Sequence, residues 1–160
     1  FYRQVRVGRG NKDFRLFKFR SMRPDSDKLG LITVGGHDPR VTRSGYYIRK
    51  YKLDEFPQLI NVFVGDMSLV GPRPEVRKYV DLYTPEQLRV LNVRPGITSL
   101  ASIRYRNENE ILAKADDPDK AYVEQIMPDK IAIDLEYVEN ASLTNDIKLI
   151  FKTFGEIIRK

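Results

Sequence analysis

Two adjacent acids, Asp54 and Glu55, open a segment in which carboxylates alternate with arginines. Asp66 follows them, and Arg73 stands between two prolines. Carboxylates beside guanidinium groups suit a divalent cation together with a phosphate, because Mg²⁺ takes one or two protein carboxylates plus phosphate oxygens and Arg offers phosphate two parallel hydrogen bonds. The flanking prolines would hold Arg73 in one geometry before a ligand arrives. This spacing predicts cation-assisted phosphate chemistry.

Asp54 stands where a helix is expected to begin, and it suits the N-cap of that helix. A helix N-terminus favours an ionised carboxylate and a nearby phosphate, because its free N–H groups and its dipole attract negative charge. An ionised Asp54 could therefore attack phosphorus, as in aspartyl-phosphate chemistry. The alternative is structural: the Asp54–Glu55 pair would only cap the helix, and Arg73 would only anchor a loop.

Four more cations are candidates for binding phosphate: Lys18, Arg49, Arg94 and Arg106. Lys18 lies in an alternating segment near the N-terminus, where it could equally belong to a solvated strand face. The chain has 28 Lys and Arg against 22 Asp and Glu, a formal charge of +6. This balance favours anionic partners, namely nucleic acid, phosphorylated substrates or an acidic lipid surface.

The composition excludes several classes of site. The chain has no Cys, which removes disulfide scaffolds, thiol catalysis and Cys-ligated zinc. Its one histidine, His37, argues against a multi-histidine metal site or a Ser–His relay and is most simply a loop residue. With 160 residues, 41% of them apolar, the chain has the size and composition of one folded domain. No apolar run of about 18 residues is present, so no membrane span is visible.

The N-terminal part predicts a β-hairpin, because residues 3–8 and 14–20 alternate in polarity around a turn-rich segment. The residues expected to face inward are Val5, Val7, Phe14 and Leu16, or in an offset arrangement Phe17 and Phe19. Residues 23–40 have no helical period and predict a loop. Residues 65–75 and 94–98 predict shaped turns, and residues 100–105 a short strand.

Helices account for most of the remainder. A short one is expected over residues 42–51, and a second opens within 53–58. The apolar face of the second consists of Leu59, Ile60, Phe63 and Val64. Thr84, with Pro85 and Gln87 after it, predicts a helix start, and Pro118 and Pro128 mark others. Together these elements predict an α+β fold: one compact, helix-rich domain over residues 1–160, held by helix–helix packing, with a small N-terminal hairpin.

The last helix, expected over residues 142–159, has two interpretations. Its apolar side chains recur at helical spacing: Leu143, Ile147, Ile150, Phe151, Phe154, Ile157 and Ile158. They could face the protein core, or part of the helix could rest on a membrane.

Several motifs occur together and in order, namely FKFRSM (17–22), Arg49 followed by LDEFPQLINVFVGDMSLVGPRPE (53–75), VRPGIT (93–98), RN (106–107) and DLEYVENASLTND (134–146). In this combination the sequence resembles the bacterial sugar transferases, monotopic polyprenyl-phosphate phosphoglycosyl transferases that initiate capsule, O-antigen and other surface glycan synthesis. The likeness covers nearly the whole chain, and DEFPQLINV…GDMSLVGPRP is its most specific part.

The resemblance implies a reaction and a set of partners. Such enzymes move a sugar-1-phosphate from a UDP-sugar to undecaprenyl phosphate and release UMP, with Mg²⁺ as cofactor. The expected place is the cytoplasmic face of the bacterial inner membrane, with the membrane surface as a partner and no nucleic acid. Relatives carry an N-terminal hydrophobic segment, so this chain, which starts at Phe1, is expected to be a soluble fragment without it.

The resemblance also implies roles for the candidate residues. Asp54 would attack the β-phosphorus and form a phosphosugar-aspartate intermediate, while Glu55 would hold Mg²⁺. The residues expected to bind the phosphates of the substrates are Lys18, Arg49, Arg73, Arg94 and Arg106. Asp66 and Asp146 match recurrent acids whose expected roles are structural.

The sequence departs from its relatives at one stretch, and two other function classes stay open. Many relatives read TGWAQVNGRN where this chain reads TSLASIRYRN (98–107), and a longer segment (108–130) follows, which leaves the donor sugar open. One rival is a non-catalytic basic module that binds nucleic acid. The other is a silent assembly scaffold of the same fold. The nucleic-acid module does not explain why three acids cluster where a phosphate should lie, and the presence of both Asp54 and Glu55 argues against the scaffold.

Overall fold

The computed structural model describes residues 1–26, 30, 32 and 38–158, without the side chains of 157 and 158. His37, half of the loop predicted over residues 23–40, and the side chains of Ile157 and Ile158 lie outside this description. In chain order the elements are β1 (Tyr2–Val7), η1 (Arg9–Asn11), β2 (Asp13–Lys18), α1 (Arg43–Lys50), η3 (Leu53–Glu55), α2 (Gln58–Phe63), β3 (Ser68–Val70), α3 (Arg77–Val80), η4 (Gln87–Asn92), β4 (Gly96–Thr98), α4 (Leu100–Arg104), α5 (Glu108–Leu112), α6 (Pro118–Ala121), η5 (Tyr122–Ile126), α7 (Met127–Glu139) and α8 (Leu143–Ile158).

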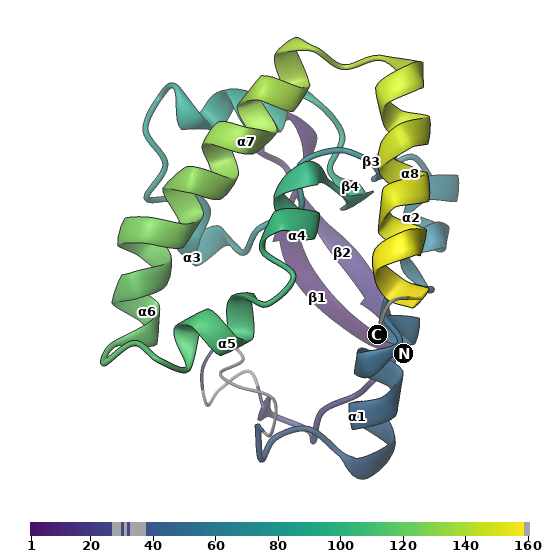
Figure 1. The fold of residues 1–160 in the computed structure, drawn as a ribbon, viewed down its shortest axis with the longest axis vertical. Helices are drawn as coiled ribbons and strands as arrows, with labels where there is room; N and C mark the ends of the chain where they lie inside the picture. The colour runs from purple at the N-terminus through teal and green to yellow at the C-terminus, as the bar shows by residue number, and fades with distance from the viewer. Residues whose placement is uncertain (27–29, 31, 33–37, 159–160) are drawn as a thin grey trace.

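The predicted α+β, helix-rich architecture with a small hairpin is confirmed. In Figure 1 the hairpin of β1 and β2 crosses the middle of the molecule, with α3, α6 and α7 on one side and α2 and α8 on the other. The apolar core lies on the α7 side. Its buried residues are Val76, Tyr79, Val90, Leu112, Tyr122, Ile126, Met127 and Ile131.

The hairpin forms as predicted, but its inward face is partly polar. The antiparallel register pairs Gln4 with Leu16 and Arg6 with Phe14. These side chains share one face because side chains alternate along a strand. Val5 therefore lies on the opposite face, where it is exposed, and the expectation that it faces inward is wrong.

α2 is oriented opposite to the hydrophobic pattern. Its buried side chains are Gln58 and Asn61, whereas Leu59, Ile60, Phe63 and Val64 are all exposed. The fully buried Asn61 replaces apolar packing with hydrogen bonds to β2. Its Oδ1 accepts from the Phe17 backbone N–H at 3.0 Å, and its Nδ2 donates to the Arg15 carbonyl at 2.8 Å.

Two short strands and one helix differ from the turn and strand predictions. β3 and β4 lie within the segments predicted as turns and pair in parallel. The backbones approach closely at their ends, since a Cβ on Gly96 would lie only 2.1 Å from the Gly71 backbone nitrogen. Residues 100–104 form α4 rather than a strand, because the Ser99 hydroxyl accepts from the Ser102 N–H and caps a helix there.

The other predicted helices are present. Thr42 caps α1. Thr84 and Gln87 bond reciprocally as a capping box, although the turn that follows is a 3₁₀ helix. α8 covers the predicted C-terminal helix, and Phe151 on it is 72% exposed. Leu143, Ile147 and Phe154 are exposed as well, so the core-facing interpretation is wrong for these four residues. In the described part of the chain, no helix combines the length and apolar character needed to cross a membrane.

Asn61→Ala should lower the free energy of unfolding by about 1–3 kcal/mol, because it removes the partner of two part-buried backbone groups of β2. Chemical denaturation measures this loss. Asn92→Ala, at the exposed end of η4, is the control and should change stability by no more than about 0.5 kcal/mol. Equal effects of the two changes would show that the Asn61 bonds contribute nothing.

Candidate active site

Asp54 is buried in the short 3₁₀ helix η3 that precedes α2. η3 begins directly after Lys52, whose backbone is left-handed with a φ of 57°. The Asp54 carbonyl accepts from the Phe19 backbone N–H at 3.0 Å, which joins this turn to the end of the hairpin. Pro57, not Asp54, occupies the N-cap of α2, so the predicted capping role of Asp54 is wrong. The residue is 6% exposed, and its Oδ1 has no hydrogen-bond partner among the described residues.

Glu55 and Arg73 form a two-pronged ion pair. Arg73 Nη1 donates to Glu55 Oε2 at 3.1 Å, and Nη2 donates to Oε1 at 2.5 Å. Arg73 Nη1 also donates to the carbonyl of Ile97 at 3.3 Å. Because the guanidinium is held on two sides, the loop around it presents Arg73 in one fixed orientation beside the acid pair.

The pKa values of the two neighbouring carboxylates are shifted in opposite directions. Burial raises the pKa of Asp54, the Glu55 carboxylate adds to this effect, and Lys18 and Arg49 oppose it. Burial alone would also raise the pKa of Glu55, but Arg73 and Lys18 hold it well below its usual range. Because Asp54 does not cap α2, the expected stabilisation of its ionised form by that helix end loses its basis, and the nearby cations favour the ionised form instead.

A cavity of about 410 Å³ lies against Asp54. Lys18 and Arg49 line it with Asp54, so three of the predicted site residues meet there. Four further cations complete the lining: Arg6, Arg20, Arg23 and Arg40. Six cations against the carboxylates of Asp25 and Asp54 give the described wall of this cavity a positive charge that suits a polyphosphate.

The other predicted residues lie elsewhere. Arg94 is exposed, and the cavity lining described above does not include it. Arg106 pairs with Glu156 of α8. Asp66 accepts a 3.3 Å hydrogen bond from Asn61, within the turn between α2 and β3. Asp146 accepts from the Tyr137 hydroxyl at 2.6 Å and joins α7 to α8.

Arg6 and Arg40 are cavity residues that the sequence analysis did not single out. Arg6 is placed by Glu75, to which its Nη1 donates at 3.0 Å. Arg40 is held by Asp38, whose Oδ2 accepts from Nη2 at 2.6 Å, and by backbone carbonyls of the preceding loop. The sequence signal for Arg40, an acid two residues before it in Asp38-Pro39-Arg40, is weak.

The donor set at Asp54 can be compared with what Mg²⁺ needs. In the described residues no three His, Cys, Asp or Glu side chains gather as a metal cage. Mg²⁺ rarely uses such a cage, since one or two carboxylates plus substrate phosphates usually hold it. The Glu55 carboxylate, held by Arg73 beside the buried Asp54, fits this requirement for one or two carboxylates.

Comparison with known proteins decides the family. The profile of the family described as "Bacterial sugar transferase" matches residues 1–160. The chain belongs to the bacterial sugar transferase family. It is 42% identical over 158 residues to the UDP-N-acetylgalactosamine-undecaprenyl-phosphate N-acetylgalactosaminephosphotransferase of Aeromonas hydrophila. It is 39% identical to the sugar transferase EpsL of Bacillus subtilis, and 38% to the UDP-glucose:undecaprenyl-phosphate glucose-1-phosphate transferase of Escherichia coli.

These bacterial sugar transferases differ from the chain in length. The matches cover 97%, 99% and 95% of this chain, in the same order. They cover 34%, 69% and 31% of the three relatives. The chain thus spans about a third of two of them and about two thirds of EpsL.

Anion binding at the cavity should weaken as the pH rises through about 8. Burial lowers the pKa of Lys18 to about 8, with Glu55 opposing the shift. The ammonium is therefore present below that pH and lost above it, well before an ordinary lysine would lose its proton. Calorimetric titration with sulfate, whose own charge is constant between pH 7 and 10, should show a several-fold loss of affinity across this range.

Lys18→Arg is the matched control, because a guanidinium keeps its charge throughout. Its sulfate affinity should stay nearly constant from pH 7 to 10. A parallel decline in both proteins would mean that another group causes the pH dependence.

Proposed function

We propose that this bacterial sugar transferase moves a sugar-1-phosphate from a UDP-sugar to undecaprenyl phosphate and releases UMP. The names of its relatives support both substrates. The observation that carries the proposal is the Asp54 carboxylate. It is buried, has one oxygen without a partner in the described structure, and lines a cavity with six cations.

In the first step Asp54 attacks the β-phosphorus of the donor. A bond forms between the carboxylate oxygen and phosphorus, the phosphoanhydride bond breaks, and UMP leaves with the bonding electrons. A phosphoanhydride resists an anionic attacker because its oxygens are negative. Lys18, Arg49 and Arg6 lie where they would offset that charge.

In the second step a phosphate oxygen of undecaprenyl phosphate attacks the phosphorus of the phosphosugar-aspartate. The aspartyl–phosphorus bond breaks and regenerates the Asp54 carboxylate, and undecaprenyl-diphosphate-sugar leaves. The covalent step lets one cavity serve a soluble nucleotide and a lipid in turn. UMP can depart before the lipid phosphate occupies the same cations.

Glu55 is proposed as the magnesium ligand. Arg73 fixes the orientation of its carboxylate through two hydrogen bonds, which leaves lone pairs of both oxygens for a cation. A Mg²⁺ ion held by Glu55 would neutralise phosphate charge.

We further propose that the protein rests on the cytoplasmic face of the bacterial inner membrane, where its lipid acceptor resides. α2 and α8 both pack against β3, and all three expose apolar side chains. Phe63 is 92% exposed and Phe151 72%, with Leu69 of β3 exposed between their helices. α2 and α8 lie together on the right in Figure 1, and the apolar side chains that they and β3 expose suit the interface of a bilayer.

Asp54→Asn should abolish UMP release, by about a thousandfold or more, because an amide cannot serve as the nucleophile. The assay uses the full-length protein with Mg²⁺, undecaprenyl phosphate and a panel of UDP-sugars. Asp81→Asn, which neutralises an exposed carboxylate after α3, is the control and should keep full activity. Normal UMP release by Asp54→Asn would refute the assignment.

The same preparation separates the transferase from its rivals. With a UDP-sugar and no acceptor, the wild-type peptide containing Asp54 should gain the mass of a sugar phosphate. A nucleic-acid module would instead release no UMP and bind nucleic acid with a steep salt dependence. A silent scaffold would do neither.

Phe63→Glu and Phe151→Glu should each weaken binding to vesicles of anionic phospholipid by about tenfold, because each removes one aromatic side chain that would enter the bilayer interface. Vesicle co-sedimentation measures the change. Leu82→Glu makes a comparable change at an exposed residue that follows α3 and is not part of α2, β3 or α8, and it should have little effect. Equal losses in all three variants would indicate that added charge, not this surface, matters.

A further inference from the structure

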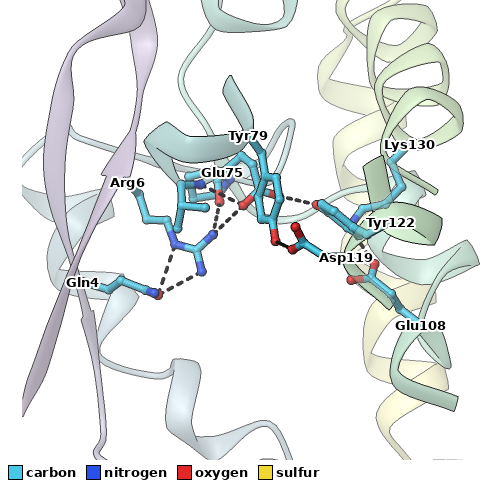
Figure 2. Close-up of polar contacts among 10 residues, drawn as sticks. Gln4, Arg6, Glu75, Tyr79, Glu108, Asp119, Tyr122 and Lys130 are labelled. Atoms are coloured by element: carbon cyan, nitrogen blue, oxygen red, sulfur yellow. Dashed lines mark hydrogen bonds and ion pairs between the residues drawn. The ribbon is translucent and has the colours of Figure 1, made fainter. Parts of the chain in front are cut away.

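A second, smaller cavity of about 220 Å³ lies beside the site. Arg6 lines both cavities, and Arg73, the partner of Glu55, lines the second. Figure 2 shows Arg6 reaching from the hairpin to Glu75, while the Tyr122 hydroxyl donates to the same carboxylate from the helical side. The smaller cavity is therefore adjacent to the phosphate site through two arginines.

The charges of the two cavities differ. The larger holds six cations against two acids. The smaller balances three cations with three acids, namely Arg6, Arg73 and Lys130 with Glu75, Glu108 and Asp134. A balanced set of charges favours neither an anionic nor a cationic ligand, but it offers many hydrogen-bond donors and acceptors. It suits an uncharged polar ligand, whereas the larger cavity suits an anion.

Asp134 indicates what kind of ligand group is missing. It is 6% exposed, and its Oδ1 has no hydrogen-bond partner within the described chain. Its carboxylate otherwise interacts with the Ser99 side chain and the Arg73 backbone. A buried carboxylate oxygen without a donor is costly, so this position needs a ligand that donates a hydrogen bond.

The remaining walls provide further acceptors and flat apolar surface. Glu108 accepts from Lys130 at 2.7 Å, and its carboxylate has lone pairs left for a second donor. The Lys130 ammonium also lies 5.3 Å from the ring centre of Tyr122. Tyr79 and Tyr83 add ring edges and faces. Carboxylates, an ammonium and aromatic rings around a small volume match the alternating hydroxyls and apolar faces of a monosaccharide.

We propose that the smaller cavity binds the sugar of the nucleotide-sugar donor, with Glu108 and Asp134 accepting hydrogen bonds from its hydroxyl groups. This inference rests on the transferase function proposed above. The diphosphate then lies under Arg6 and Arg73, the nucleotide occupies the larger, cationic cavity, and α5 carries sugar selectivity through Glu108.

The test compares UMP release from UDP-glucose, UDP-galactose, UDP-N-acetylglucosamine and UDP-N-acetylgalactosamine. Glu108→Gln and Asp134→Asn should each lower kcat/KM for the preferred donor by at least about tenfold, the size of one hydrogen bond to a charged group. They should also change the ranking of the four sugars. The affinity for UDP, which has no sugar, should stay within about twofold of the wild-type value by calorimetry.

Matched variants exclude a merely structural effect. Glu110→Gln changes an exposed acid of the same helix that does not line the cavity, so the ranking of the sugars should persist. Asn109→Ala changes an exposed lining residue while the Glu108–Lys130 pair stays intact, so the ranking should shift.

The outcomes separate the two proposals. If the wild-type protein releases UMP from no donor, the transferase proposal fails. If it does release UMP, the sugar-site inference alone can still be overturned. That happens if the lining variants leave the ranking of the four donors unchanged, or if they lower kcat/KM for every donor and the affinity for UDP by one common factor.

Discussion

The Arg73 guanidinium and the Glu55 carboxylate meet through two hydrogen bonds across 18 residues of chain. One partner belongs to the turn that carries Asp54, and the other to the proline-flanked loop after β3. A partly buried ion pair gives up hydration, so it persists only where both partners are held in place. The Ile97 carbonyl and the flanking prolines hold Arg73, and η3 holds Glu55. This contact joins the turn that carries the acid pair to the loop whose Arg73 lines the smaller cavity.

Features encoded by neighbouring residues could be predicted from the sequence. The hairpin, the short helix α1 and the capping box at Thr84 depend on residues a few positions apart, and they form as expected. The acid pair and its basic surroundings were likewise visible as a motif. Features set by distant contacts were not. Arg6 enters the site because Glu75 holds it, and Arg106 is paired with Glu156, and neither partner is near in sequence.

α2 shows why periodicity alone can mislead. Its apolar stripe predicts a buried face, yet the fold buries Gln58 and Asn61 and turns the stripe outward. This orientation is stable because Asn61 satisfies backbone groups of β2, which an apolar residue could not do. A hydrophobic pattern shows that a face avoids water, but it does not say whether protein or lipid covers it.

The residues around the two cavities come from segments spread over most of the chain, for example Arg6, Asp54, Arg73 and Asp134. The hairpin likewise contacts elements far from it in sequence, such as α3. Contacts between segments distant in sequence can form only after both segments have been synthesised. During translation the hairpin and Asp54 leave the ribosome well before α7. A nascent chain that has not yet reached α7 therefore lacks Asp134, and the smaller cavity is incomplete until that helix has been made.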